Sequence, residues 1–143
     1  FFKKSTIIVH ARELEAAKAP DAANSGYFAA DWDHPIPMKT IDGQFDLFDD
    51  GKIVLVPLPG HTPGTMGALV KLDRSGEFLL ASDAVSIRAN LDQNIVPKNT
   101  KDAEQFLRSF EEIRRIEKAG ATIICSHDES QWNSLRKGMN AYD

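Results

Sequence analysis

Short runs of apolar, often β-branched residues alternate with polar turns along most of this chain, which is typical of a sheet of short strands. The pattern predicts strands at residues 6–9, 53–56 and 122–125. It also predicts two hairpins. One joins 38–41 to 44–48 around Asp42-Gly43, a strong turn signal, and the other joins 65–72 to 78–81 through a turn at 73–76.

One long helix stands out at residues 102–119. Its apolar positions fall on one face at helical spacing: Phe106, Phe110, Ile113 and Ile116. Asn99 or Thr100 is expected to cap its start, and Gly120 to end it. Shorter helices are expected at 11–19 and 130–137, and a long loop is expected at 21–37, after the first of them. Hairpins followed by a helix and a strand favour an α/β (α+β) fold, with helices on the outer face of the sheet.

Composition bounds the class of protein. The 143 residues are 42% hydrophobic and 27% charged, which suits a single domain with a buried core. The net charge of −4, without a basic stripe, argues against a nucleic-acid partner. No apolar run approaches the roughly 20 residues of a membrane helix. Cys125 is the only cysteine. No internal disulfide can therefore form, and we expect a cytoplasmic protein.

Three residues suggest metal chemistry. His61, Asp83 and His127 each follow a short apolar run, so all three are expected on loops at strand ends. Imidazole nitrogen and carboxylate oxygen are both zinc ligands. The structural alternative is that the histidines cap turns and the aspartate accepts bonds from local backbone N–H groups.

The segments around these residues carry a family resemblance. Pro-Gly-His-Thr-Pro-Gly (59–64), Leu-Leu-Ala-Ser-Asp-Ala (79–84) and Ile-Ile-Cys-Ser-His-Asp (123–128) resemble the metallo-β-lactamase superfamily. Residues 6–17 and 83–92 look most like its N-acyl-homoserine lactonases, which quench quorum sensing. The resemblance implies part of an αββα sandwich with two zinc ions. His61 would bind the first zinc, Asp83 would bridge the two, and His127 would bind the second.

The resemblance also implies a reaction. The complete protein would be a zinc-dependent hydrolase that opens the lactone ring of N-acyl-homoserine lactones with a zinc-bridged hydroxide. Its partner would be a small-molecule lactone or ester, with neither nucleic acid nor a membrane. Two alternatives remain: another hydrolase of the superfamily, such as a glyoxalase II-like thioesterase, and a metal-free remnant that acts as a binding module.

Two departures qualify the resemblance. The family's other metal motif, His-x-His-x-Asp-His, is absent from residues 1–143. We therefore expect a single domain that forms the C-terminal portion of the fold, as a fragment or as a degenerate paralogue. It is expected to pair with a second copy or with a complementary N-terminal segment. In addition, Ser86 stands where such lactonases usually carry a tyrosine that hydrogen-bonds the lactone carbonyl. Asp83 and Ser86 are thus the candidate catalytic residues, Ser86 acting through water.

Loop aromatics give a candidate substrate pocket. Phe28, Trp32 and His34 lie in the 21–37 loop and would wall an acyl-chain site, because amphipathic ligands favour aromatic surfaces. The alternative is that these side chains pin the loop to the core.

Overall fold

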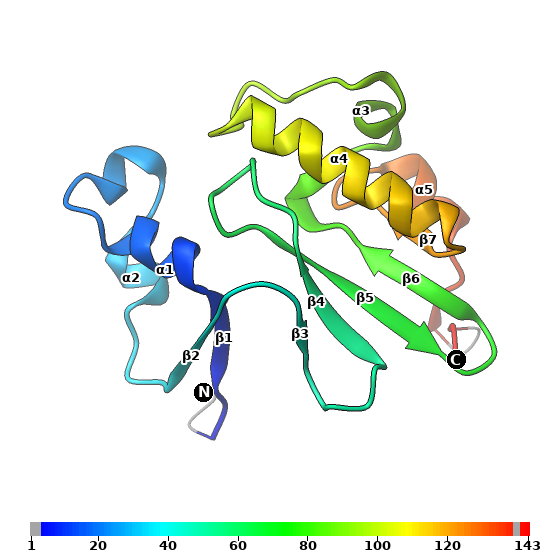
Figure 1. Cartoon of the computed structure of the whole chain (residues 1–143), viewed down its shortest axis with the longest axis horizontal. Helices are drawn as coiled ribbons and strands as arrows, with labels where there is room; N and C mark the ends of the chain where they lie inside the picture. Colours follow the sequence, from blue (N-terminus) through cyan, green and yellow to red (C-terminus); the bar gives the residue numbers. More distant parts are fainter. Residues whose placement is uncertain (1–3, 139–140) are drawn as a thin grey trace.

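Two sheets organise the computed structural model, which describes residues 4–138 and 141–143 (Figure 1). Strands β1 (Ile7–His10) and β2 (Met38–Ile41) form a parallel pair. The second sheet has five strands in the order β3 (Phe45–Asp46), β4 (Ile53–Pro57), β5 (Met66–Leu72), β6 (Gly76–Leu80) and β7 (Thr122–Ile124). Neighbours are antiparallel from β3 to β6, whereas β7 runs parallel to β6, so the sheet is mixed.

The helices are α1 (Ala11–Lys18), α2 (Ala29–Trp32), α3 (Arg88–Gln93), α4 (Ala103–Lys118) and α5 (Glu129–Ser134). Single 3₁₀ turns lie at Ala22–Ser25 and Ser82–Ala84. Figure 1 shows α4 lying across the five-stranded sheet, with α1 and α2 grouped beside β1 and β2. Among the described residues, no helix is long and apolar enough to cross a lipid bilayer.

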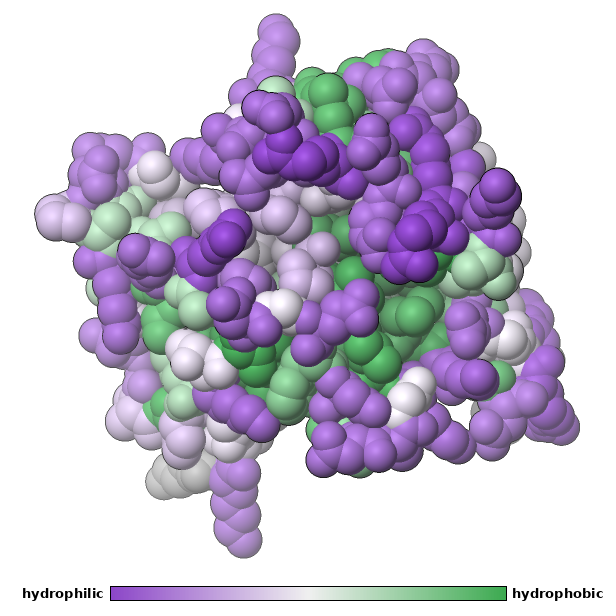
Figure 2. Space-filling view, in the orientation of Figure 1, coloured by the Kyte–Doolittle hydropathy of each residue, from purple (hydrophilic) through white to green (hydrophobic). Residues whose placement is uncertain are grey.

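The core lies between α4 and the five-stranded sheet. The apolar face expected for α4 is confirmed, since its four members are buried against strand residues that include Val56, Leu79 and Ile123. The rings of Phe106 and Phe110 meet edge to face, with centroids 4.9 Å apart. Fully burying such a side chain contributes about 1.5–3 kcal/mol. Figure 2 shows hydrophilic side chains on the outward side of α4 and apolar surface below it, over β4 and β5.

The expected hairpin at residues 38–48 is wrong. β2 pairs in parallel with β1, with Met38 opposite Ile7, while β3 pairs with β4, with Phe45 opposite Leu55. The turn carries the chain from one sheet to the other, and Gly43 adopts a φ of 91° there. Asp-Gly chemistry specifies a sharp bend, but the pairing is decided by which strand edges are free.

Helix boundaries differ from expectation in three places. Asp102 caps α4, accepting a 2.9 Å bond from the backbone N–H of Gln105, so neither Asn99 nor Thr100 is the cap. The expected loop at 21–37 contains a 3₁₀ turn and α2. Helix α3 was not expected, because six residues are too few to show a helical period. The other expected strands and helices are present to within a few residues.

Candidate metal centre

His61, Asp83 and His127 lie together at one end of the five-stranded sheet, on the segments that follow β4, β6 and β7. His127 Nε2 is 3.0 Å from Asp83 Oδ1, and His61 Nε2 is 3.9 Å from Asp83 Oδ2. The structure thus gathers three residues that the sequence spreads over 67 positions. Their role as metal ligands stays a prediction.

The two oxygens of Asp83 face different partners. Oδ1 accepts a 3.0 Å bond from Ser126 Oγ in addition to its contact with His127, while Oδ2 faces His61. The carboxylate sits on the 3₁₀ turn Ser82–Ala84, and Ser82 has a φ of 52°. A carboxylate flanked by one imidazole on each side can be shared between two cations, with one histidine for each.

The donor chemistry fits a shared site and not a closed one. Structural zinc sites close a shell of four donors around one ion. In residues 4–138 and 141–143, no group of three His, Cys, Asp or Glu side chains is placed to hold a single ion. Within the described residues, His127 faces one oxygen of the Asp83 carboxylate and His61 faces the other.

The loop that carries His61 is fixed against the start of α4. Both Lys101 and Asp102 donate their backbone N–H to Gly60 O, at 2.9 and 3.0 Å, and Ser109 Oγ donates to Pro59 O at 2.7 Å. At Gly60 the backbone has a φ of 136°, and a Cβ there would lie only 2.4 Å from the Phe106 Cα. Glycine is thus required both for the backbone conformation and for the close approach.

The loop that carries His127 is held by the segment after Asp83. The His127 N–H donates to Ser86 O at 2.8 Å, and the Ser126 N–H donates to Val85 O at 3.1 Å. Ser86 therefore positions the loop through its carbonyl, while the role expected for its hydroxyl stays a prediction. The Asp128 carboxylate accepts from the N–H groups of Arg88 and Gln131, at 2.9 and 3.0 Å. These bonds hold the pKa of the Asp128 carboxyl below its usual range, and the bond from Arg88 contributes most.

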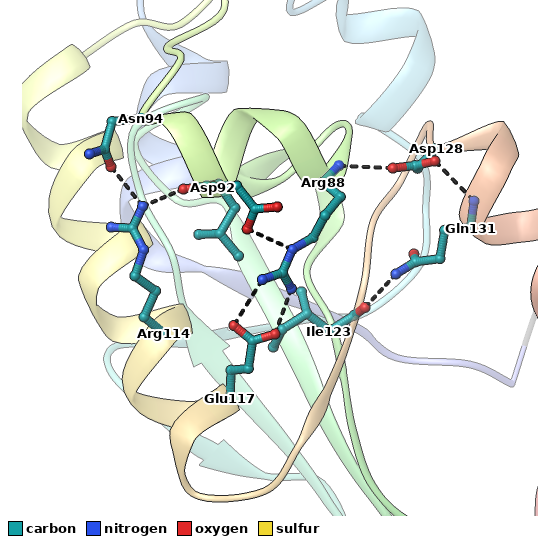
Figure 3. A network of polar contacts seen from close by, with 9 residues as sticks. Arg88, Asp92, Asn94, Arg114, Glu117, Ile123, Asp128 and Gln131 are labelled. Carbon is teal, nitrogen blue, oxygen red and sulfur yellow. Dashed lines mark hydrogen bonds and ion pairs between the residues drawn. The ribbon is translucent and has the colours of Figure 1, made fainter.

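Arg88 ties this region to the end of α4. Its guanidinium donates to both oxygens of Glu117, at 2.5 and 3.2 Å, and to Asp92 at 2.8 Å (Figure 3). Glu117 raises the pKa of Arg88 most strongly, with Asp92 next. Since the backbone N–H of Arg88 binds Asp128, one residue links α3, α4 and the His127 loop.

Cys125 lies on the same segment, buried just before the His127 loop. Burial raises the pKa of its thiol to about 11. A thiol that stays protonated at neutral pH is a poor nucleophile and a poor metal ligand. Cys125 therefore serves as a small buried core residue.

Of the three residues expected to form a substrate pocket, two line the same cavity and the third does not. Trp32 and His34 line a cavity of about 340 Å³ together with Tyr27 and apolar side chains of β1, α1 and β2. Phe28 does not line it, and this side chain is 55% exposed. Sequence reasoning missed Glu13, which lines the same cavity and bonds the His61 loop. A single acidic residue in a helical first turn gives no signal of such a role.

No established family model matches the chain. Over 99% of its length it is 33% identical to the N-acyl homoserine lactonase AttM of Azorhizobium caulinodans, of which it covers 57%. A solved N-acyl homoserine lactone hydrolase, holding its product N-hexanoyl-L-homoserine at the catalytic metal centre, superimposes with a TM-score of 0.85. That match is 27% identical and covers 99% of this chain and 54% of the hydrolase.

This chain resembles part of an N-acyl homoserine lactonase. It spans about half the length of the relatives it matches. A more distant structure, the dizinc quorum-quenching lactonase AidC, shares the fold with a TM-score of 0.65 at 13% identity, over 96% of this chain and 53% of AidC. The α/β fold expected from the sequence is thus confirmed, and it is the fold of these solved lactonases.

Proposed function

We propose that the complete protein is a metal-dependent hydrolase that opens the lactone ring of N-acyl homoserine lactones. The observation that carries the proposal is the Asp83 carboxylate, which presents one oxygen to His61 and the other to His127. Lactonase similarity over 99% of the chain supports the substrate class. The small-molecule lactone is accordingly the proposed partner, and the cytoplasm the proposed location.

Each of the three candidate ligands has a distinct role in this proposal. His61 and His127 would each help to hold one zinc ion, and Asp83 would contact both. Two zinc ions would supply Lewis acidity and a hydrolytic water whose pKa is lowered towards neutrality. Ser126 Oγ, 3.0 Å from Asp83 Oδ1, orients the carboxylate that the ions share.

The hydroxyl of Ser86 is the proposed donor to the lactone carbonyl oxygen, directly or through a water. A well-placed donor of this kind contributes about 10²–10³ in rate, and less when a water intervenes. Trp32 and His34, which line the cavity beside α1, are the proposed contacts for the acyl chain.

The test is hydrolysis of N-hexanoyl homoserine lactone by the full gene product loaded with zinc. Asp83→Ala is expected to remove both bound zinc and turnover, because the residue would contact both ions. Asp73→Ala is the matched control, since Asp73 lies in the β5–β6 turn and pairs with the exposed Lys52 at 3.2 Å. Ser86→Ala should keep its zinc and lose less activity.

Two outcomes would contradict the proposal. An Asp83→Ala protein with normal zinc content and turnover would remove Asp83 from the metal centre. A wild-type protein that hydrolyses a glutathione thioester and leaves the lactone intact would point to the thioesterase alternative.

A further inference from the structure

Glu13, in the first turn of α1, joins two segments that are far apart in the sequence. Its Oε2 accepts a 2.8 Å bond from the backbone N–H of Gly64, and its Oε1 accepts a 2.9 Å bond from the Tyr27 hydroxyl. Hydrogen bonds to an ionised carboxylate are roughly twice as strong as neutral ones. One side chain therefore connects the cavity wall to the loop that carries His61.

The loop and α1 are also in direct van der Waals contact. A Cβ on Gly64 would lie 2.4 Å from the Glu13 Cβ and 2.6 Å from the Glu13 backbone nitrogen. Gly64 itself is buried. Any side chain at this position would push the loop away from α1, so the glycine and the glutamate form one fitted contact.

The Glu13 bond completes the support of His61. On the side before His61, the loop is fixed to α4 through Pro59 O and Gly60 O. On the side after His61, Gly64 is fixed to α1 by Glu13. The backbone is therefore held on both sides of His61, by α4 before it and by α1 after it.

Tyr27 fixes the orientation of the Glu13 carboxylate. Burial, followed by the nearby Glu13, raises the pKa of Tyr27 to about 12, so the phenol stays protonated and acts as a donor. With Oε1 engaged by this hydroxyl, Oε2 points to Gly64. A free glutamate side chain would lose rotamer entropy in reaching the loop, and the Tyr27 bond offsets part of that cost.

We propose that Glu13 is a positioning residue, which sets the direction of the His61 imidazole towards Asp83 by holding Gly64. The proposal rests on the proposed function, in which His61 binds zinc. Its geometric part, the coupling of Glu13 to the His61 ring, can be measured without zinc and without substrate.

Three variants of Glu13 separate the effect of side-chain length from the effect of the negative charge. Glu13→Gln keeps an acceptor for Gly64 and can donate its amide to the Tyr27 hydroxyl. Its neutral bonds are weaker, so it should lie close to the wild type and well above Glu13→Ala. Glu13→Asp keeps the charge but is shorter by one methylene, so it should behave like Glu13→Ala. The assays are the ring ¹H–¹⁵N signals of His61 and His127 in the metal-free full gene product, and zinc affinity by competition with a chelator.

The Asp and Ala variants are expected to shift or broaden the His61 signals, leave those of His127 unchanged, and weaken zinc binding by about 10–100-fold. The Gln variant should restore most of the zinc affinity and the position of the His61 signals. Wild-type signals and affinity in Glu13→Asp, or a Gln variant as impaired as Ala, would overturn the proposal.

Should the Asp and Ala variants fail to fold, Tyr27→Phe decides. It frees the carboxylate without removing it and is expected to alter the His61 signals alone, whereas unchanged signals would overturn the proposal. A protein that binds zinc but leaves lactones intact would contradict the proposed function and not the role of Glu13.

Discussion

Substituting Gly60 by alanine should damage the candidate metal centre more than its single added carbon suggests. The new Cβ would lie 2.4 Å from the Phe106 Cα, whereas ordinary contacts begin at 3.4 Å, so the loop and α4 must separate by about 1 Å. The φ of 136° adds backbone strain of about 1–3 kcal/mol. Overpacking adds about 1–3 kcal/mol more, which gives a loss of stability of about 2–6 kcal/mol.

Gly43→Ala is the matched control. Gly43 also has a positive φ, 91°. Apart from its own chain neighbours, no heavy atom of the described residues lies within 4 Å of the point that an added Cβ would occupy, so only the strain remains. Urea unfolding followed by circular dichroism gives both losses of stability. The catalytic effect should be separate, because a displacement of about 1 Å can cost 10²-fold in rate. A Gly60→Ala protein no less stable than Gly43→Ala would refute the steric argument.

Two further outcomes follow from the titrating groups. Cys125, with a thiol pKa of about 11, should react with iodoacetamide at pH 8 about two orders of magnitude more slowly than a free cysteine, and normally once urea unfolds the protein. Asp128 has a pKa lowered in the fold, so its contribution to stability is present above the unfolded-state pKa and is lost as the pH falls towards the folded-state value. Asp128→Asn keeps a helix cap but has no titrating group. The difference in free energy of unfolding between wild type and variant, measured with urea, should therefore be smaller at pH 3 than at pH 6.

The sequence predicted what depends on local pattern. The apolar face of α4 follows from helical periodicity. The approach of His61 to Asp83 was expected from their places at strand ends together with the family resemblance. It failed where pairing is decided at a distance, because Asp42-Gly43 marks a bend without saying which strands meet. It was silent on Glu13, whose role comes from a partner 51 residues away. The dimer or complementary segment expected from the sequence stays a prediction.

The parallel pairing of β7 with β6 also bears on the order of folding. Parallel neighbours need a long crossover, and here residues 81–121, including α3 and α4, must be placed before β7 can dock. Contacts of such sequence separation form slowly, because loop closure opposes them. His127 follows β7 directly, so it reaches Asp83 only when this last strand is in place. His127 and Asp83 would therefore bind a metal ion together only after β7 has docked, and partly folded chains would not bind the ion through this pair.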